Sequence, residues 1–369
     1  MTIKSSEILN KLQRVNYKAI KDYENKMDLL IDFVNEKMAN RINIDNLIGN
    51  NPLNIMYDNH ANHANFMVNI FKITDDEFFY KTLIWVYNTY KHHGFSYDYF
   101  KVELNQWIDG INKFLKPASA KLIIPIYQWM IDNHQIFIKE SENLENEKLR
   151  IPEEFKEEYQ VYFEGLIHGD FNSCLSAIKP KITGQDDLKI LYNVIYTSLY
   201  NIGVLWQKGI ISVTEEHLAS SISTRIISYL YSEFIDLDKN KGKAVITAIP
   251  NEYHEIGSRI VADALEMDGW EIRHLGANTP LEDLINYLKS EKPLFIVLSV
   301  TMSFNIHNLI DTIEKIRSIP ALKDIKILVG GKVFNDNPNL WKKTGADRFA
   351  KNEKAAITIA RKWWMEVNK

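Results

Sequence analysis

The last third of the sequence alternates between short apolar runs and amphipathic stretches. Apolar runs of strand length lie at residues 244–249, 270–275, 294–300, 325–329 and 348–350, helical patterns lie between them, and a last one covers residues 355–367. Strands that alternate with helices form parallel sheets, because each helix carries the chain back to the start of the next strand. The pattern predicts a doubly wound, five-stranded parallel sheet within residues 243–369.

A histidine follows the first predicted strand. His254 lies in the segment 251–257, with Glu252 two residues before it, at the carboxyl end of that strand. Ligands of open parallel sheets bind at this edge. A neutral imidazole there can bind a metal while a neighbouring carboxylate holds its other nitrogen. A single loop histidine is more often an ordinary solvated side chain, so the prediction depends on the other strand ends.

Two more strand ends carry suggestive residues. Ser299, followed by Thr301, ends the third predicted strand, whose long apolar run predicts a central position. Gly330 and Gly331 end the fourth. Paired glycines let a ligand approach the backbone closely, and a serine hydroxyl can anchor it. Together with His254 these positions predict a ligand slot at one edge of the sheet.

Residues 1–140 show helical patterns throughout, with stretches at residues 6–38, 57–71, 97–115 and 118–138 and one from an Asp75 or Asp76 cap to residue 90. This region is rich in aromatic residues, and five of the ten histidines lie in it: His60, His63, His92, His93 and His134. One interpretation is a helical domain with an aromatic core and surface histidines. The other is a pocket for a flat conjugated ligand such as a tetrapyrrole, held non-covalently because the region has no cysteine.

A polar linker, residues 140–152, precedes a second helical block over residues 153–235. Its helices break near residues 168–170 and 179–184, and the third, residues 187–206, ends at Lys208-Gly209. The fourth opens with a capping box formed by Ser212 and Glu215. Four helices with short loops predict an up-down bundle. A second polar stretch separates this bundle from the sheet.

Composition excludes several classes of site. The net charge is −4 with 25% charged residues, which gives no general basic field for nucleic acid. The single cysteine, Cys174, cannot build a disulfide framework, a thiolate zinc site or an iron–sulfur cluster within one chain. The N-terminus lacks an apolar secretory core, and the longest apolar run, residues 122–131, is too short to span a bilayer. We therefore expect a soluble cytoplasmic protein that does not contact membranes.

The strand-end residues together resemble a known motif. Cobalamin-binding domains that hold the corrinoid base-off carry an acidic residue, any residue, His, two residues and Gly, then Ser-x-(Leu or Thr), then Gly-Gly. The matching residues here are Glu252, His254, Gly257, Ser299, Thr301, Gly330 and Gly331. The intervals between the three parts match the family, and so does the segment 275–280.

The resemblance implies a Rossmann-like cobalamin domain and a role for each matching residue. His254 is expected to displace the benzimidazole base and become the lower axial ligand of cobalt. Glu252 is expected to hydrogen-bond the far imidazole nitrogen. Ser299 is expected to contact the displaced base, while Gly330 and Gly331 leave room for the nucleotide tail.

The helical block resembles the cap that covers the upper corrin face in methionine synthases and cobalamin photoreceptors. Trp206, followed after nine residues by Glu216 and His217, is similar to the signature of CarH-type light sensors, which bind adenosylcobalamin. The resemblance implies that these three residues line the upper pocket. Gln207 stands where the best-known photoreceptors have a histidine, so the same residue cannot supply an upper ligand here.

The resemblance does not extend to residues 1–140, where neither a winged helix nor a basic recognition helix is visible, so we expect no direct DNA-binding domain. A helical pigment-binding domain joined to a cobalamin domain is loosely similar to photocobilins, which implies a non-covalent bilin such as biliverdin. That ligand is an expectation for residues 1–140.

The leading hypothesis is a cobalamin-binding light sensor and signalling protein, not an enzyme. Photolysis of the Co–C bond of adenosylcobalamin would rearrange the helical cap, and a homo-oligomer or a signalling partner protein would respond. The alternative is a corrinoid methyl carrier of a methyltransferase system. A mutase is disfavoured, because residues 1–140 are too few and too helical for a (β/α)8 barrel.

Overall fold

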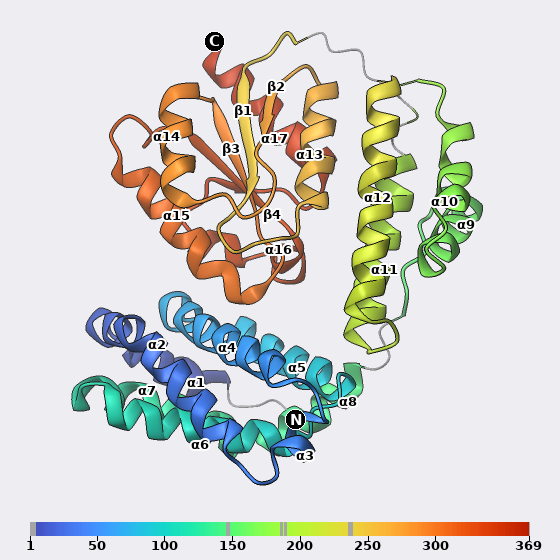
Figure 1. Cartoon of the computed structure of the whole chain (residues 1–369). Coiled ribbons are helices and arrows are strands. Elements are labelled where there is room, and N and C mark those ends of the chain that lie inside the picture. Colours follow the sequence, from blue (N-terminus) through green and yellow to red (C-terminus); the bar gives the residue numbers. More distant parts are fainter. Residues whose placement is uncertain (1–4, 145–147, 185–186, 188–189, 235–238, 369) are drawn as a thin grey trace. The chain divides into compact units, whose positions relative to one another are not determined.

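The computed structural model describes residues 5–144, 148–184, 187, 190–234 and 239–368. The chain divides into two compact units (Figure 1), and each is described by itself. The first comprises Met1–Glu147 with Gln207–Gly209, and the second comprises Lys148–Trp206 with Ile210–Lys369. Within the described ranges, no helix is long and apolar enough to cross a membrane.

The described part of the first unit is helical, as predicted for residues 1–140. Its helices are α1 (Ser5–Arg14), α2 (Tyr17–Ala39), α3 (Ile44–Ile48), α4 (Leu53–Ile73), α5 (Asp76–His92), α6 (Tyr97–Phe114), α7 (Pro117–Asp132) and α8 (His134–Asn143). Asp75 caps α5 by accepting a hydrogen bond from Phe78 N at 2.9 Å, which confirms one of the two predicted caps.

Two predicted helices of this unit are divided by asparagines. The stretch 6–38 breaks where Asn16 adopts an extended backbone and its side chain accepts from Ala19 N at 3.0 Å, which starts α2. The stretch 118–138 breaks at Asn133, whose side chain donates to Trp129 O at 2.8 Å. Asparagine side chains compete with the helix for backbone hydrogen bonds, so periodicity alone misses such breaks.

Aromatic and histidine side chains fill the interior of the first unit. Tyr23 and Tyr127 share a buried hydrogen bond of 2.8 Å, and the ring of His63 lies 5.1 Å from that of Trp107. His60 is buried, and burial, together with the neighbouring His63, lowers its pKa to about 3. Burial likewise lowers the pKa of His63 to about 3. Both imidazoles are therefore neutral near pH 7.

The remaining histidines of this unit have polar partners. His134 is buried and contacts Tyr87 Oη at 2.9 Å, and His92 Nδ1 donates to Asn88 O at 2.8 Å. The interpretation of these histidines as surface residues is therefore wrong for His60 and His134. Interior polar atoms without a hydrogen-bond partner among the described residues include His60 Nε2, His63 Nε2 and Tyr99 Oη. Such atoms are rare in folded proteins.

A carboxyl group is buried beside these rings. Glu103 is 4% exposed, and its Oε1 accepts from Trp107 Nε1 at 2.8 Å. Burial raises the pKa of Glu103 to about 8, although the Trp107 hydrogen bond acts in the opposite direction. The carboxyl is therefore mostly protonated at pH 7, and this part of the interior carries no full charge.

The burial of Glu103 predicts a pH-dependent effect of Glu103→Gln. The folded chain keeps this proton up to about pH 8, while the unfolded chain releases it near 4.5, so wild type loses stability as pH rises through this window. Glutamine cannot ionise and keeps an oxygen for Trp107. We expect the difference in unfolding free energy between Glu103→Gln and wild type to increase with pH in this window, by up to about 1.4 kcal/mol per pH unit in favour of the variant.

Urea unfolding followed by circular dichroism at several pH values measures this difference. The matched control is Glu142→Gln on α8, where the replaced carboxylate is exposed. A constant difference between Glu103→Gln and wild type from about pH 5 to about pH 8 would contradict a protonated Glu103.

The helical block of the second unit contains α9 (Lys156–Ile167), α10 (Phe171–Ile178), α11 (Tyr196–Gln207) and α12 (Val213–Phe234). A π-helical turn, Leu191–Ile195, leads into α11. The predicted capping box is confirmed, because Glu215 N donates to Ser212 Oγ at 3.3 Å while Glu215 Oε2 accepts from Ser212 N at 2.6 Å. Ile260 of the sheet region joins the buried core of this block.

The rest of the second unit is the predicted parallel sheet. Its strands are β1 (Lys243–Ala248), β2 (Glu271–His274), β3 (Phe295–Ser299), β4 (Lys326–Gly330) and β5 (Arg348–Phe349), in the order β2-β1-β3-β4-β5. Its helices are α13 (Ile256–Met267), α14 (Leu281–Glu291), α15 (Ile306–Ser318), α16 (Lys332–Asp336) and α17 (Glu353–Val367). As Figure 1 shows, α13 and α17 lie on one side and α14 and α15 on the other. The central place of β3 confirms the prediction.

The register of the sheet aligns the strand ends that matter for ligand binding. Ala248 of β1 pairs with Ser299 of β3, and Ser299 pairs with Gly330 of β4. Three strands therefore end in one row, and the loops that follow them leave from the same edge.

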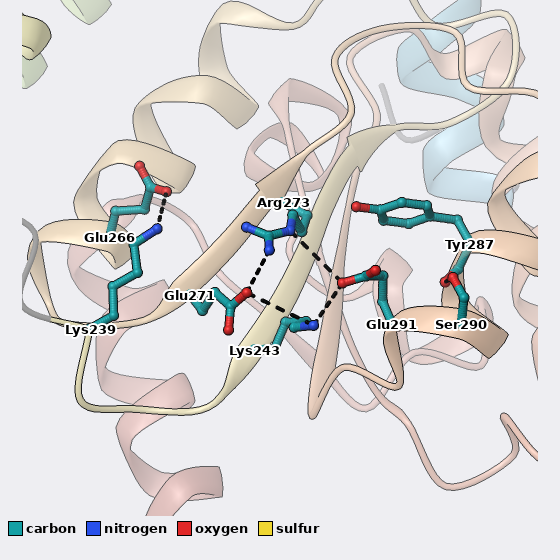
Figure 2. A network of polar contacts seen from close by, with 8 residues as sticks. All are labelled: Lys239, Lys243, Glu266, Glu271, Arg273, Tyr287, Ser290 and Glu291. Carbon is teal, nitrogen blue, oxygen red and sulfur yellow. Dashed lines mark hydrogen bonds and ion pairs between the residues drawn. The ribbon is translucent and has the colours of Figure 1, made fainter.

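A charged network occupies the start of the strands (Figure 2). Lys243 contacts Glu291 at 2.7 Å and Glu271 at 3.9 Å, while Arg273 contacts the same carboxylates at 3.8 and 2.6 Å. Alternating charges on short side-by-side strands stabilise an edge modestly and discourage pairing with another chain. This network begins with the first residues of β1 and β2, so it lies away from their carboxyl ends.

The predicted boundaries of the three domains, residues 1–140, 153–235 and 243–369, stay predictions. Of the two predicted linkers, residues 145–147 and 236–238 lie outside the described residues. Helix α8 continues to Asn143, into the stretch that the composition favoured as linker.

Candidate functional site

The loop after β1 is built around a buried carboxylate. Glu252 is fully buried, and its Oε2 accepts hydrogen bonds from Thr301 N at 2.9 Å and Met302 N at 3.0 Å. Asn305 Nδ2 donates to the same oxygen at 3.2 Å. Three donors on the loop after β3 therefore fix one oxygen of Glu252, and the other oxygen faces the histidine.

That other oxygen holds His254. Glu252 Oε1 lies 2.5 Å from His254 Nδ1 and also accepts from the backbone N of His254 at 3.2 Å. Because a carboxylate accepts, Nδ1 carries the hydrogen, and Nε2 of the neutral ring is left with its lone pair. The side chain of His254 is 54% exposed, so this nitrogen is accessible to a ligand. The arrangement orients a neutral imidazole for metal coordination.

The pKa values of the pair shift in opposite directions. Burial alone would raise the pKa of Glu252, but the hydrogen bond and charge of His254 and the N–H groups of Met302 and Thr301 lower it. Burial alone would lower the pKa of His254, but the hydrogen bond and charge of Glu252, and the charge of Glu216, raise it. Glu252 thus stays ionised and keeps its hydrogen bond to Nδ1.

At the glycine pair, the chain's own backbone occupies the space beside Gly331, and the expected room for a nucleotide tail stays a prediction. Gly330 O accepts from Val300 N at 3.0 Å, and Gly331 has a φ of +109°. A Cβ on Gly331 would lie 2.1 Å from Val300 O. Only glycine fits this position, because the conformation is left-handed and the backbone of the neighbouring loop fills the space of a side chain. Ser299, which pairs with Gly330, is 7% exposed.

Two residues that support the site were not singled out from the sequence, Met302 and Asn305, and a third, Asn278, was noted only as part of the matching segment 275–280. Asn278 Oδ1 accepts from Asn251 N at 2.8 Å, and Asn278 N donates to Glu252 O at 2.9 Å. Asn305 Nδ2 also donates to Asn251 O at 3.0 Å. Asn251 and Asn278 both have positive φ, a conformation that asparagine tolerates, and asparagines in strand-end loops were the available signal.

The predicted upper-face residues lie on α11 and α12. Trp206 is partly buried against the core of the helical block. Glu216 accepts from Ser220 Oγ at 2.7 Å, and its charge makes a small contribution to the raised pKa of His254. His217 is 74% exposed and lies 3.7 Å from Glu216. Of these residues, Glu216 thus has an electrostatic effect on His254, whereas His217 is exposed.

Gln207 follows Trp206 in the sequence but belongs to the first compact unit of the chain. Its Oε1 accepts from Trp85 Nε1 at 2.9 Å, and its Nε2 lies 3.4 Å from Asn88 Oδ1. These hydrogen bonds engage both ends of the amide. Gln207 is 9% exposed.

Comparison with known families identifies both parts of the second unit. Residues 242–359 match a family model described as B12 binding domain, and residues 160–231 match a second model with the same description. The first match contains Glu252, His254, Ser299 and the glycine pair. The chain therefore contains a cobalamin-binding domain with a Rossmann-like sheet and a helical partner region.

Proteins of similar sequence include corrinoid proteins and a transcriptional repressor. Dimethylamine corrinoid protein 3 of Methanosarcina acetivorans is 24% identical over 208 residues, which are 54% of this chain and 96% of that protein. The HTH-type transcriptional repressor CarH of Myxococcus xanthus is 27% identical over 174 residues, 47% of this chain and 54% of that protein. A solved monomethylamine corrinoid protein of Methanosarcina barkeri has 19% identity and a TM-score of 0.48, and covers 56% of this chain and 97% of its own.

The residues present fit a corrinoid. His254 offers one oriented nitrogen, which suits a cobalt that already carries four ring nitrogens. Within the described residues, a shallow surface hollow after β2 is lined by Leu275, Asn278 and Tyr287, among others, but not by His254. The oriented nitrogen of His254 is therefore the feature that fits a corrinoid, as a lower ligand of its cobalt.

The geometry of Gly331 predicts the effect of Gly331→Ala. The added Cβ meets Val300 O at 2.1 Å, and the left-handed φ adds strain. We expect a loss of about 2 kcal/mol or more in the free energy of unfolding, measured by urea denaturation.

Gly257→Ala is the matched control, because a Cβ at Gly257 in α13 meets nothing within 4 Å. Alanine is the better helix former, so this variant should be about as stable as wild type or up to about 1 kcal/mol more stable. Equal stability of the two variants would show that the loop after β4 adapts to a side chain.

Proposed function

We propose that this chain is a corrinoid protein that binds cobalamin with His254 as the lower ligand of cobalt and carries a methyl group for a methyltransferase partner. The observation that carries the proposal is the Glu252–His254 pair, which presents Nε2 outward while the loop after β3 fixes the carboxylate. The length of the similarity supports the methyl-carrier assignment, since the matched regions cover 96% of dimethylamine corrinoid protein 3 of Methanosarcina acetivorans and 94% of dimethylamine corrinoid protein 1 of Methanosarcina mazei.

The cofactor would supply a cobalt atom that accepts and releases an alkyl group on its upper face. The chain's own contribution is positional. Glu252 holds a proton on His254 Nδ1, so in the neutral ring the lone pair lies on Nε2, and the backbone N–H groups of Thr301 and Met302 keep Glu252 ionised in a buried place. In this proposal the chain transfers no proton itself and acts with a partner that performs the methyl transfer.

The lower-ligand assignment predicts the behaviour of His254→Ala. Purified full-length chain is mixed with methylcobalamin, and the absorption spectrum is recorded. Wild type should show the shift that accompanies replacement of the benzimidazole by a histidine, and His254→Ala should not. Exposed His168 provides the matched control, and His168→Ala should behave as wild type.

Glu252→Gln gives a graded version of the same test. An amide cannot accept from both the loop N–H groups and His254 with the strength of a carboxylate, so we expect cobalamin affinity to fall about 10- to 100-fold. If His254→Ala keeps the spectrum of a histidine-ligated cofactor, His254 is not the lower ligand of cobalt.

A second function, light sensing, is favoured by one observation on α12. The charge of Glu216 makes a small contribution to the raised pKa of His254, an effect that supports the upper-pocket role implied by the Trp206, Glu216 and His217 signature. In this second proposal the bound form is adenosylcobalamin, photolysis alters the helical block, and a homo-oligomer or a signalling partner responds. The similarity to CarH of Myxococcus xanthus over 174 residues supports it.

A second ligand in the first unit belongs to the same proposal. His60 Nε2, His63 Nε2 and Tyr99 Oη are interior atoms without a partner among the described residues, and Trp107 lies beside both imidazoles. A flat conjugated molecule held non-covalently, such as biliverdin, would supply polar partners and stack on the rings. This ligand stays a prediction.

One experiment separates the two functions. Chromophores are extracted from protein purified in the dark and separated by chromatography, and the adenosylcobalamin-loaded protein is illuminated during size-exclusion chromatography. A methyl carrier is expected to yield methylated or unalkylated corrinoid and to keep its elution volume in light. Adenosylcobalamin with a light-dependent change in elution volume would instead establish the sensor, and a red-absorbing extract would establish the bilin.

A further inference from the structure

A tyrosine on α11 connects three separate segments of the second unit. The guanidinium carbon of Arg150, in the stretch before α9, lies 3.4 Å from the centroid of the Tyr200 ring. The ammonium group of Lys332, the residue after Gly331, lies 5.5 Å from the same centroid. Two cations from opposite ends of the unit's sequence therefore contact one aromatic ring.

The backbone of Arg150 is held in place by Asn201 of α11. Asn201 Oδ1 accepts from Arg150 N at 2.9 Å, and Asn201 Nδ2 donates to Arg150 O at 2.7 Å. Asn201 is fully buried and also donates to Tyr159 Oη at 2.7 Å. A side-chain amide that pairs with both backbone groups of one residue holds the chain there, so Arg150 is fastened to α11 before its guanidinium reaches Tyr200.

Lys332, the other cation, lies directly after the glycine pair at the end of β4. Gly331 lies close to the loop after β3, because a Cβ built on it would come within 2.1 Å of Val300 O. Lys332 begins α16 and pairs with Asp336 at 2.5 Å. The contact between Lys332 and Tyr200 therefore links α11 to the segment that follows the glycine pair.

The position of α11 matters because Trp206, a predicted upper-face residue, lies near the end of this helix. Trp206 lies six residues after Tyr200, about 9 Å along the same helix, and packs against the core of the helical block. A helix of this length moves as a rigid piece, so a restraint at Tyr200 is also a restraint on Trp206. Arg150 and Lys332 are both exposed, so each cation contributes a modest attraction to the ring face.

We propose that Tyr200 is a positioning residue that, with Arg150 and Lys332, latches α11 to the sheet edge and so keeps the helical block closed over the corrinoid site. The importance of this latch for the cofactor rests on the proposed function. The latch itself depends only on contacts within the chain. Through Arg150, the residues just before α9 also take part in this latch.

The first test uses the full chain without cofactor and measures backbone amide exchange by mass spectrometry. Tyr200→Leu removes the ring face, whereas Tyr200→Phe keeps it and serves as the matched control. We expect amides of α11 and of residues 330–336 to exchange about three- to tenfold faster in Tyr200→Leu and at the wild-type rate in Tyr200→Phe. Arg150→Gln and Lys332→Gln should each reproduce part of the acceleration.

The second test uses hydroxocobalamin-loaded protein and follows replacement of the upper ligand by cyanide. Tyr200→Leu and Arg150→Gln should react about threefold faster or more, with the spectrum of the histidine-ligated cofactor unchanged beforehand. Tyr200→Phe should match wild type. This readout reports access to the upper face, which loss of general stability would not change selectively.

Specific outcomes overturn the proposal. If Tyr200→Phe exchanges as fast as Tyr200→Leu, the ring face is not what holds α11. If Lys332→Gln leaves amide exchange unchanged, α11 is not tied to the sheet edge. If wild type takes up no hydroxocobalamin, the proposed function fails, but the amide-exchange comparison still decides whether the latch exists.

Discussion

The acceptance of three hydrogen bonds by one oxygen of Glu252 is the interaction on which the candidate site depends. A buried carboxylate without partners would be costly, so the loop after β3 must supply N–H donors where β1 ends. Adjacent parallel strands with aligned ends meet that requirement. The orientation of His254 is then a consequence, because the second oxygen has one direction left in which to accept.

The same constraint explains what the sequence could predict about the site. The types and spacing of Glu252, His254, Ser299 and Gly331 predicted the edge, because strand ends in a parallel sheet converge, but the left-handed conformation of Gly331 was not predicted. The support from Met302 and Asn305 was not predictable from periodicity. Met302 contributes only its backbone, which any residue carries, and Asn305 acts through the path of a loop.

The helices, too, could be predicted from the sequence only in part. Asp75 and the Ser212–Glu215 box were predictable because capping is local in sequence. The breaks at Asn16 and Asn133 were not, because an asparagine inside a helical pattern continues or ends a helix according to tertiary packing. Burial of His60 was missed for the related reason that a polar residue at helical spacing has no marker for the face it will occupy. The surrounding aromatic residues decided it.

The aligned register of β1, β3 and β4 limits how such a chain can change. Alternate residues of a strand face opposite sides, so inserting one residue within β3 or β4 would turn every following side chain to the other face and offset Ser299 from Gly330. Insertions directly after β3 would leave that pairing intact but would move Thr301 and Met302 away from the carboxylate of Glu252. The edge should therefore tolerate changes in length only beyond Asn305, the last residue of this loop that contacts Glu252.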